Sequence, residues 1–378
     1  MDSSQKLTNT DVKKLNKNRI FRLIYNSDKI SRQEIADQLG LSLPTVNQNL
    51  KMLMEDGLIE YVGNFTSTGG RRAQAITISN NARKAISVNI KADYINVDVV
   101  GLKGQIIYSM AVKAHFSKSS AYIEKLTDAV RHAVDYVGAD ADDILGVGVT
   151  VPGILDDEKQ ILISAPPLKA KNYDFTKLIS AIDYPVVVMN DARAEAYADH
   201  WFNGKPQDEK IYIMLGEGVG GAYINASAIR NGVHNRGGEF GHMVIHPGGK
   251  QCLCGKKGCF EAYVSEKVLS SELDMTLDNF FELAAQGNKN NSNVLDEYMD
   301  NLALGINNIY TMMDCDIVLG GTVAPYLKQY DNSIKERLVN DYSFDTDADY
   351  LRISDGGGRK SGLGAALSFV ARFIDGVE

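Results

Sequence analysis

Three cysteines and one histidine form the most chemically distinctive group in the sequence. Cys252, Cys254 and Cys259 lie within eight positions, and His242 stands ten residues before the first of them. Zinc binds thiolate and imidazole groups, and four such ligands close a tetrahedral structural site. Glycines at 248, 249, 255 and 258 allow a short loop to fold around an ion. The pattern therefore predicts structural Zn²⁺ held by His242, Cys252, Cys254 and Cys259.

Other interpretations of the same residues remain. Free cysteine also packs as a small apolar side chain, and two of these thiols could form a disulfide. A disulfide is disfavoured because the chain has no secretory signal and is not rich in cysteine. His246 is a rival fourth ligand, but it sits closer to Cys252 and beside Pro247, so His242 is preferred. Cys315 lies in a mostly apolar run and is expected in the core.

Two carboxylates flank the predicted metal loop. Glu239 precedes His242 by three residues, and Glu261 follows Cys259 by two. They are either solvated charges or, together with His242, polar groups that face a ligand. If they face a ligand, the metal-binding loop forms part of the wall of a small-molecule site.

Length and composition indicate a soluble globular protein with more than one domain. The 378 residues suffice for two or three domains, and 44% of them are hydrophobic. No apolar run approaches the roughly 20 residues of a membrane span. The N-terminus is polar and lacks the apolar segment of a signal peptide. We therefore expect a cytoplasmic protein without a membrane partner.

Charge is distributed unevenly along the chain. The whole sequence has a formal net charge of −8. Residues 1–75 carry 11 Lys and Arg against 8 Asp and Glu, or +3, and the rest carry 29 against 40, or −11. A mildly basic front end on an acidic body indicates, weakly, a module that binds a polyanion.

The first 78 residues have the order of elements of a winged helix-turn-helix. Thr10 is the expected N-cap of a first helix. Ser31 and Glu34 form a capping box that opens a second helix, which Gly40 ends. Ser42 caps a third helix with Pro44 in its first turn. Strands are expected at 57–62 and 75–78, and the third helix is expected to bury Val46, Leu50, Leu53 and Met54.

This arrangement predicts DNA binding. The third helix would enter the major groove, where Asn and Gln pair with adenine and Lys contacts phosphate or guanine. Two arginines at the hairpin tip would lie along a minor groove. Taken singly, each feature is also typical of ordinary surface. The predicted DNA contacts are Ser42, Pro44, Thr45, Asn47, Gln48, Lys51, Arg71 and Arg72.

From residue 85 the pattern alternates between strands and helices, which predicts an α/β fold. Ligands bind such folds at the carboxyl ends of parallel strands. Gly153, Asn190 and Asp191 follow two of these strands and are candidate ligand contacts, although Asn190-Asp191 could equally cap a helix. Strands are expected at 86–90, 94–100, 105–111, 144–151, 186–189, 211–215 and 222–225, with helices at 121–137 and 192–200.

Several short motifs follow one another in order between residues 85 and 378. They are Val-Pro-Gly at 151–153, Asn-Asp-Ala at 190–192, Gly-Glu-Phe-Gly-His at 238–242, Cys-Leu-Cys-Gly-Lys-Lys-Gly-Cys-Phe-Glu at 252–261 and Leu-Gly-Gly at 319–321. In these motifs the chain resembles the ROK family, named for repressors, open reading frames and kinases. With its winged front end it is similar to the sugar-responsive repressors of that family.

The resemblance implies an actin-like, ribonuclease-H-like pair of lobes over 79–378, with a sugar in the cleft and the C-terminal helix packed back on the first lobe. His242 would hold zinc through one ring nitrogen and a sugar hydroxyl through the other. The sugar-binding residues that it implies are Gly153, Asn190, Asp191, Glu239, His242 and Glu261.

The resemblance also raises the alternative of an ATP-dependent sugar kinase. In kinase members Asp191 would be the general base. The first phosphate loop, Asp-x-Gly-Gly-Thr in the family, is Asn-Ile-Lys-Ala-Asp at 89–93, and Asp93 would repel phosphate. The second, at 216–218, carries Glu217 instead of Thr. Leu-Gly-Gly at 319–321 survives but is also a tight turn. These departures favour a protein with no catalytic residues.

One departure concerns the sugar itself. Where the family often has Asn-Leu followed by Trp, residues 165–171 read Ala-Pro-Pro-Leu-Lys-Ala-Lys. An amide and a stacking ring are missing, which indicates an unusual or weakly bound sugar. We therefore expect a DNA-binding repressor, released by a sugar or sugar derivative from a palindromic operator as a homodimer or homotetramer. An activator is not excluded by the residues.

Overall fold

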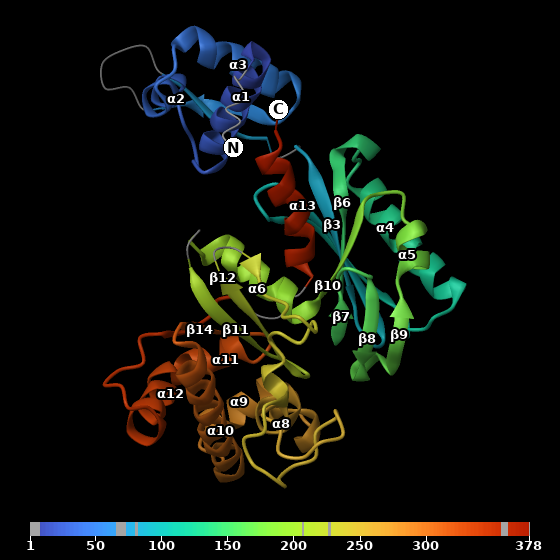
Figure 1. Cartoon of the computed structure of the whole chain (residues 1–378), viewed down its shortest axis with the longest axis vertical. Coiled ribbons are helices and arrows are strands. Elements are labelled where there is room, and N and C mark those ends of the chain that lie inside the picture. Colours follow the sequence, from blue (N-terminus) through green and yellow to red (C-terminus); the bar gives the residue numbers. More distant parts are fainter. Residues whose placement is uncertain are drawn as a thin grey trace, which may run out of the picture.

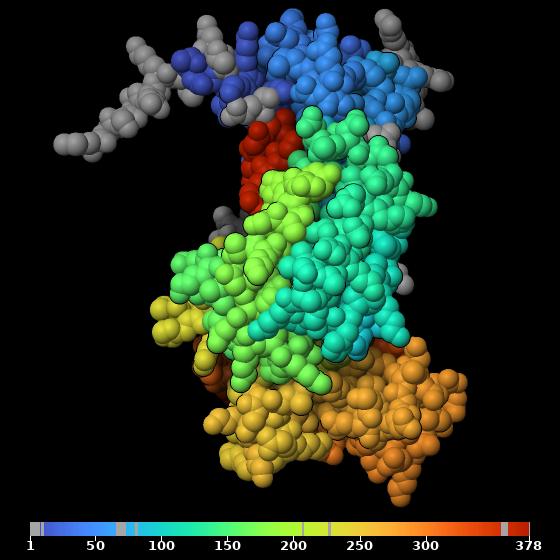
Figure 2. Space-filling model, turned by 90° about the vertical axis from the view of Figure 1, so that its right-hand side faces the viewer, coloured from blue at the N-terminus to red at the C-terminus, as the bar shows by residue number. Residues whose placement is uncertain are grey.

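The computed structural model describes residues 8–65, 73–79, 82–205, 208–225, 228–356 and 362–377. Figures 1 and 2 show three parts in a row, with an N-terminal head at one end, a first lobe in the middle and a second lobe at the other end. The α/β class, the winged head and the pair of lobes agree with the predicted fold. Within the described ranges, no helix is long and apolar enough to cross a membrane.

The three helices of the head begin at capping residues. The first begins two residues earlier than predicted, because Thr8 and not Thr10 is its N-cap. Asp11 stands three residues after Thr8, so the two form a reciprocal capping box. The capping box of Ser31 and Glu34 is confirmed, as is the cap at Ser42. The elements are α1 (Asn9–Tyr25), α2 (Arg32–Leu39), α3 (Leu43–Glu55), β1 (Ile59–Asn64) and β2 (Gln74–Ile78).

The buried face of α3 differs in one position from the predicted one. Val46, Leu50 and Leu53 are buried, but Met54 is only partly so. Asn49 is buried as well, and its amide donates a hydrogen bond of 2.8 Å to the carbonyl of Thr45. A polar residue on this face is tolerated because that bond satisfies it inside the helix.

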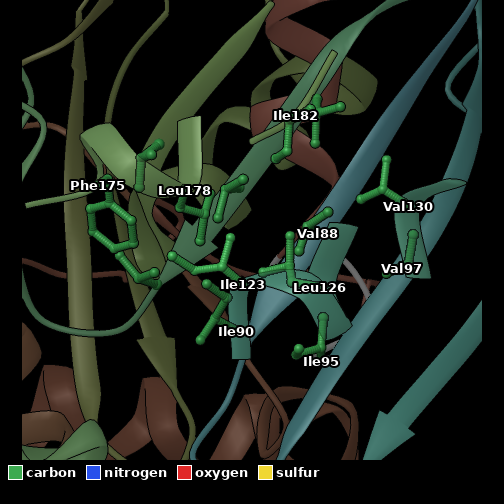
Figure 3. Packing of buried hydrophobic residues seen from close by; sticks show 14 of the residues in the cluster. Val88, Ile90, Ile95, Val97, Ile123, Leu126, Val130, Phe175, Leu178 and Ile182 are labelled. Atoms are coloured by element: carbon green, nitrogen blue, oxygen red, sulfur yellow. The ribbon is translucent and has the colours of Figure 1, made fainter. Parts of the chain in front are cut away.

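The first lobe is a five-stranded sheet in the order β10-β6-β3-β4-β5, with helices on both faces (Figure 1). Every residue of β3 is buried, because α4 covers one face and the C-terminal helix α13 (Leu363–Asp375) covers the other. Figure 3 shows Val88, Ile90, Ile95 and Val97 of the sheet packed against Ile123 and Leu126 of α4. The elements are β3 (Lys84–Ile90), β4 (Tyr94–Gly101), β5 (Ile106–Lys113), α4 (Ser120–Tyr136), β6 (Ile144–Val151), β7 (Ile154–Asp156), β8 (Ile161–Ala165), β9 (Ala170–Asp174), α5 (Thr176–Ser180) and β10 (Val186–Asn190).

The second lobe is built on a sheet in the order β13-β12-β11-β14-β15. Phe260, Phe280, Tyr298 and Leu302 pack against one face of this sheet, and all four are buried. The elements are β11 (Glu209–Leu215), β12 (Val219–Asn225), β13 (Ala228–Ile229), α7 (Glu261–Val264), α8 (Glu266–Leu269), α9 (Leu277–Ala285), α10 (Lys289–Met313), β14 (Asp316–Gly320), α11 (Ala324–Leu327), α12 (Asp331–Arg337) and β15 (Leu351–Ile353).

Two helices connect the parts. α6 (Asp191–Asn203) follows β10 of the first lobe and packs on β11 and β12 of the second. α13 (Leu363–Asp375) packs on β6 and β3 and also crosses α6. The crossing is close, since a Cβ on Gly364 would lie 1.8 Å from the carbonyl oxygen of Ala194. The C-terminal helix therefore lies on the first lobe.

The head is docked on the end of α13. The rings of Phe21 in α1 and Phe373 in α13 meet edge to face with centroids 6.1 Å apart. Asn18 donates a 2.9 Å hydrogen bond to the carbonyl of Ile374, and the Tyr25 hydroxyl donates one of 2.9 Å to the carbonyl of Leu102. One cluster of buried apolar residues thus continues from the head into the first lobe.

Candidate functional site

A cavity of about 370 Å³ lies between the two lobes. Its walls come from residues 89–96 and 152–167 of the first lobe, from the start of α6, and from 214–221 and 239–267 of the second lobe. Its size is in the range of small-molecule sites. The fold brings all six residues predicted to bind a sugar to these walls: Gly153, Asn190, Asp191, Glu239, His242 and Glu261.

The side chain of Asn190 makes hydrogen bonds that hold the backbone of the cavity wall. It caps α6, since its side-chain oxygen accepts the backbone N–H of Arg193 at 3.0 Å. Its amide donates to the carbonyl of Gly153 at 2.8 Å. Gly153 has φ +102°, and a Cβ there would lie 2.3 Å from the carbonyl oxygen of Ser164. These contacts fix the direction in which Asp191, the next residue, enters the cavity.

Asp191 is a buried carboxylate beside a lysine. Its side chain is 8% exposed, and the Nζ of Lys91 lies 3.9 Å from its Oδ2. Burial raises the pKa of Asp191, and the charge of Lys91 acts in the opposite direction. Lys91 belongs to the first phosphate loop and was not predicted as a site residue. The replacement of a loop glycine by a cationic residue is the sequence feature that could have identified Lys91 as a cavity residue.

The neighbouring Asp93 points away from the cavity. Its carboxylate is exposed and lies 2.8 Å from Nδ1 of His115. It therefore faces His115 and does not line the cavity, and the repulsion of phosphate by Asp93 stays a prediction. The loop contributes a cation, Lys91, to the cavity instead.

The turn at 238–242 presents two polar side chains because its glycines press against β12. A Cβ on Gly238 would lie 2.1 Å from the carbonyl oxygen of Gly221, and one on Gly241 would lie 2.1 Å from that of Val219. Close packing of this turn leaves Glu239 and His242 on the cavity side. Burial raises the pKa of Glu239, while His242, with Nε2 3.8 Å from Oε2 of Glu239, opposes that shift.

The side chains of His242, Cys252, Cys254 and Cys259 converge on one point. Their ligand atoms all lie within 4.8 Å of one another. The sulfurs of Cys254 and Cys259 are 3.7 Å apart, and the sulfur of Cys252 is 3.8 Å from Nδ1 of His242. A zinc–sulfur bond of about 2.3 Å implies a tetrahedral edge of about 3.8 Å. The donor set therefore fits one tetrahedral ion.

The rival residues lie outside this group. Nε2 of His246 is 2.6 Å from the side-chain oxygen of Asn301, and its ring packs edge-on against Tyr263. The loop also needs Gly258, where a Cβ would lie 1.8 Å from the carbonyl oxygen of His246. Cys315 is half-buried at the edge of the core of the second lobe.

Carboxylates occupy the turns that would meet a phosphate. Glu261 accepts the backbone N–H of Val219 at 2.9 Å, and Glu217 lines the cavity beside it. Glu195, in α6, accepts the backbone N–H of Gly321 at 2.9 Å. Glu195 was missed by sequence reasoning, although its spacing of four residues from Asp191 on one helix places both on the same face.

Gly321, in the surviving Leu-Gly-Gly motif, has a structural reason to be glycine. It has φ +83°, and a Cβ there would lie 2.3 Å from the carbonyl oxygen of Leu215. A tight strand-to-helix turn therefore accounts for the glycine at position 321, with no nucleotide required.

On the head, most of the predicted DNA contacts share the exposed side of α3. Ser42, Pro44, Asn47, Gln48 and Lys51 are exposed, and Thr45 is partly so. Arg32, from the start of α2, was not predicted; its guanidinium lies 3.4 Å from the side-chain oxygen of Asn47. The predicted contacts Arg71 and Arg72 lie outside the described residues.

Comparison with known proteins gives a family for each part of the chain. The model of the ROK family matches residues 85–370, and that of a winged helix-turn-helix DNA-binding domain matches residues 15–60. The chain is 28% identical to the xylose repressor of Bacillus subtilis (strain 168) over 319 residues, which is 82% of each protein.

Solved structures agree in fold. A ROK family transcriptional regulator, a homologue of the Escherichia coli MLC protein, is similar over 97% of this chain and 98% of that one, with 21% identity and a TM-score of 0.74. A ROK family glucokinase from Streptomyces griseus, in complex with glucose and AMPPNP, is similar over 75% of this chain and 98% of that one, with 25% identity and a TM-score of 0.63.

Proposed function

This chain belongs to the ROK family, and from that membership and the geometry of its two sites we propose that it is a DNA-binding transcriptional repressor controlled by a sugar. The observation that carries the proposal is the position of α6. The helix starts at Asp191 in the cavity, and near its other end the ring of Trp201 lies 6.4 Å from that of Tyr25 in α1 of the head. A change at the ligand site therefore has a rigid path to the DNA-binding part.

The ligand would lie between the lobes. Glu239, Glu261 and Asp191 offer acceptors, and His242 offers a ring N–H, so together they suit the hydroxyl groups of a sugar. Gly153 and Asn190 shape the wall. Ligand binding would close the lobes around the sugar, provided that the closed state binds it more tightly than the open one.

Repression would follow from DNA binding by two heads. Asn47 and Gln48 would read bases in the major groove, and Lys51 would contact phosphate or guanine. We propose a homodimer or homotetramer on a palindromic operator, because a two-fold symmetric assembly would place its heads on two matching half-sites. Closing the lobes would change the spacing of the heads, so that they no longer match both half-sites.

Zinc is the metal that we propose for the Cys₃His group. Four protein ligands leave no open position, so the ion would be structural. It would bind Nδ1 of His242, and Nε2 would then carry the proton and donate it toward a sugar oxygen or Glu239. The metal thereby holds the cavity wall in shape.

The alternative of a sugar kinase rests on Asp191 at the position of a general base. Burial raises the pKa of Asp191, and Lys91, 3.9 Å away, acts in the opposite direction, so the proposal against phosphorylation rests on the phosphate loops. The loop at 89–93 lacks both glycines and the threonine of the kinases, and the turn at 216–218 keeps its two glycines but carries Glu217 in place of the threonine. We therefore propose that the chain does not phosphorylate its ligand.

The function is tested with the full-length protein. Duplex DNA selected from a random pool identifies an operator, and a thermal-shift screen identifies sugars that bind. We expect a stabilising sugar to lower operator affinity, with no ADP released from ATP. Turnover that disappears in Asp191→Asn would establish the kinase, and failure to select any duplex would contradict DNA binding.

The metal assignment is tested by measuring the zinc content of the purified protein. We expect about one equivalent of zinc per chain by mass spectrometry, and a loss of that zinc in Cys254→Ser. Cys315→Ser is the matched control, since Cys315 lies outside the group. Equal zinc content in the two variants would contradict the assignment.

A further inference from the structure

We infer that the cleft selects an uncharged sugar and rejects the phosphate ester of the same sugar. The inference rests on the proposed sugar-sensing function and adds the chemical class of the effector. It is carried by the charges on the cavity wall and by the hydrogen bonds that those charges already make.

Acidic groups outnumber basic groups around the cavity. The walls carry three cations, Lys91, Arg193 and Lys267. Against these stand six carboxyl groups, Asp191, Glu195, Glu217, Glu239, Glu261 and Glu266. Burial raises the pKa of Glu195 to about 7, but the excess of acidic groups does not depend on its charge, because the other five still outnumber the three cations. A phosphate dianion entering this space would meet like charges in a partly desolvated site, where repulsion is much stronger than in water.

Two of the three cations already have acidic partners. Lys91 lies beside Asp191, at 3.9 Å. The buried guanidinium of Arg193 donates to Asp157 at 3.0 Å and to the carbonyl of Asn235 at 2.9 Å. An incoming phosphate would have to compete with these carboxylates for each cation. Lys267 alone would have to offset the remaining acidic groups.

The hydrogen-bond donors in the turns at 216–219 and 319–322 also have acidic partners already. The N–H of Val219, after the 216–218 turn, donates to Glu261 at 2.9 Å. The N–H of Gly321 donates to Glu195 at 2.9 Å, and the hydroxyl of Thr322 donates to Glu266. Backbone amides and hydroxyls of this kind bind phosphate in other proteins, but here each one holds a carboxylate. An uncharged sugar needs none of them to be released.

The two halves of the cavity therefore differ in what they can accept. The half formed by Asp191, Glu239 and His242 presents acceptors and a donor for hydroxyl groups. The half formed by the 216–219 and 319–322 turns presents carboxylates where a phosphate would lie. A ligand that carries hydroxyl groups alone satisfies the first half and leaves the second half undisturbed.

The test compares each sugar with its own phosphate ester on the full-length protein. Glucose, N-acetylglucosamine and xylose are titrated calorimetrically beside their phosphate esters, and pyrophosphate serves as a probe that needs no sugar. We expect any sugar that binds to lose affinity by about 100-fold when phosphorylated, and pyrophosphate not to bind. A phosphate ester that binds as tightly as its parent would overturn the inference and leave sugar sensing intact.

Charge removal distinguishes repulsion from poor fit. In Glu217→Gln we expect the penalty for the phosphate ester, or for pyrophosphate, to shrink by about 10-fold, with binding of the parent sugar unchanged. Glu158→Gln is the matched control, because Glu158 is exposed and does not line the cavity. An unchanged penalty in Glu217→Gln would overturn the inference. If neither a sugar nor its phosphate ester binds, the sugar-sensing proposal fails. The titration with pyrophosphate then tests by itself whether the cavity rejects phosphate, because pyrophosphate needs no sugar site.

Discussion

Glu195 is a carboxyl group withdrawn almost completely from water. It is 1% exposed, in α6 between the cavity and the sheet of the second lobe. Burial raises its pKa to about 7, although hydrogen bonds from Gly321 and Tyr212 act in the opposite direction. The charge on this group therefore changes close to neutral pH, and its environment favours the protonated form.

Stability should depend on the protonation of Glu195. Because its folded pKa lies above the unfolded value, the folded protein binds the proton more tightly, and stability falls as pH rises from about 4.5 to about 7. Glu195→Gln keeps an acceptor but removes the charge, so we expect it to unfold at higher temperature than the parent at pH 8. The gain is at most about 3 kcal/mol, from roughly 1.4 kcal/mol per pKa unit.

The measurement is the thermal midpoint of both proteins at pH 5.5 and pH 8. Glu158→Gln provides the control for loss of an exposed charge. A difference between Glu195→Gln and the parent that is the same at both pH values would show that Glu195 titrates normally.

Among the elements, α3 has the most specific expected role. Its exposed side carries Asn47, Gln48 and Lys51, and Arg32 reaches it from α2. We expect Gln48→Ala to weaken binding to the selected operator by roughly 5- to 150-fold, the value of a lost bidentate base contact. Non-specific duplex should bind the variant nearly as well as the parent.

Lys51→Ala provides the contrasting result. If Lys51 contacts phosphate, its loss weakens operator and non-specific duplex alike and reduces the slope of log affinity against log salt by about 1. Fluorescence anisotropy at several salt concentrations measures both effects. A loss confined to one sequence would mean that Lys51 reads a base.

The helices and strands that could be predicted well from the sequence are those marked by residues close together in the chain. Ser31 and Glu34 mark the start of α2, and the buried strand around Val149 is largely an apolar run. The start of α1 was misplaced because Thr8 and Thr10 are both good caps and only the partner Asp11 distinguishes them. Local patterns therefore located elements better than their ends.

The parts of the site that sequence missed depend on contacts between distant segments. Lys91 meets Asp191 across 100 positions, and Arg193 meets Asp157 across 36. Nothing near Lys91 in the sequence indicates a carboxylate partner. By contrast, the Cys₃His group could be predicted, because three of its four ligands lie within eight positions.

In the whole molecule, the ligand cavity and the head lie at opposite ends of one helix. α6 is anchored to the second lobe by Asp199, which accepts hydrogen bonds from Arg352 at 2.6 Å and Ser354 at 2.9 Å. Its other side crosses α13, whose end carries the head. Movement of the second lobe against the first therefore has to move α6 against α13, and α1 contacts both of these helices, through Tyr25 and Phe21.

The contact of Trp201 with Tyr25 is the point at which this coupling can be broken. We expect Trp201→Ala to leave sugar affinity unchanged and to reduce the effect of sugar on operator affinity by roughly 2- to 30-fold, which corresponds to 0.5–2 kcal/mol of coupling. Calorimetry gives the sugar affinity, and anisotropy with and without sugar gives the coupling. Tyr136→Ala, in an aromatic residue that is 68% exposed on α4, controls for the loss of a large ring. If Trp201→Ala retained the full response, the signal would have to reach the head through α13 alone.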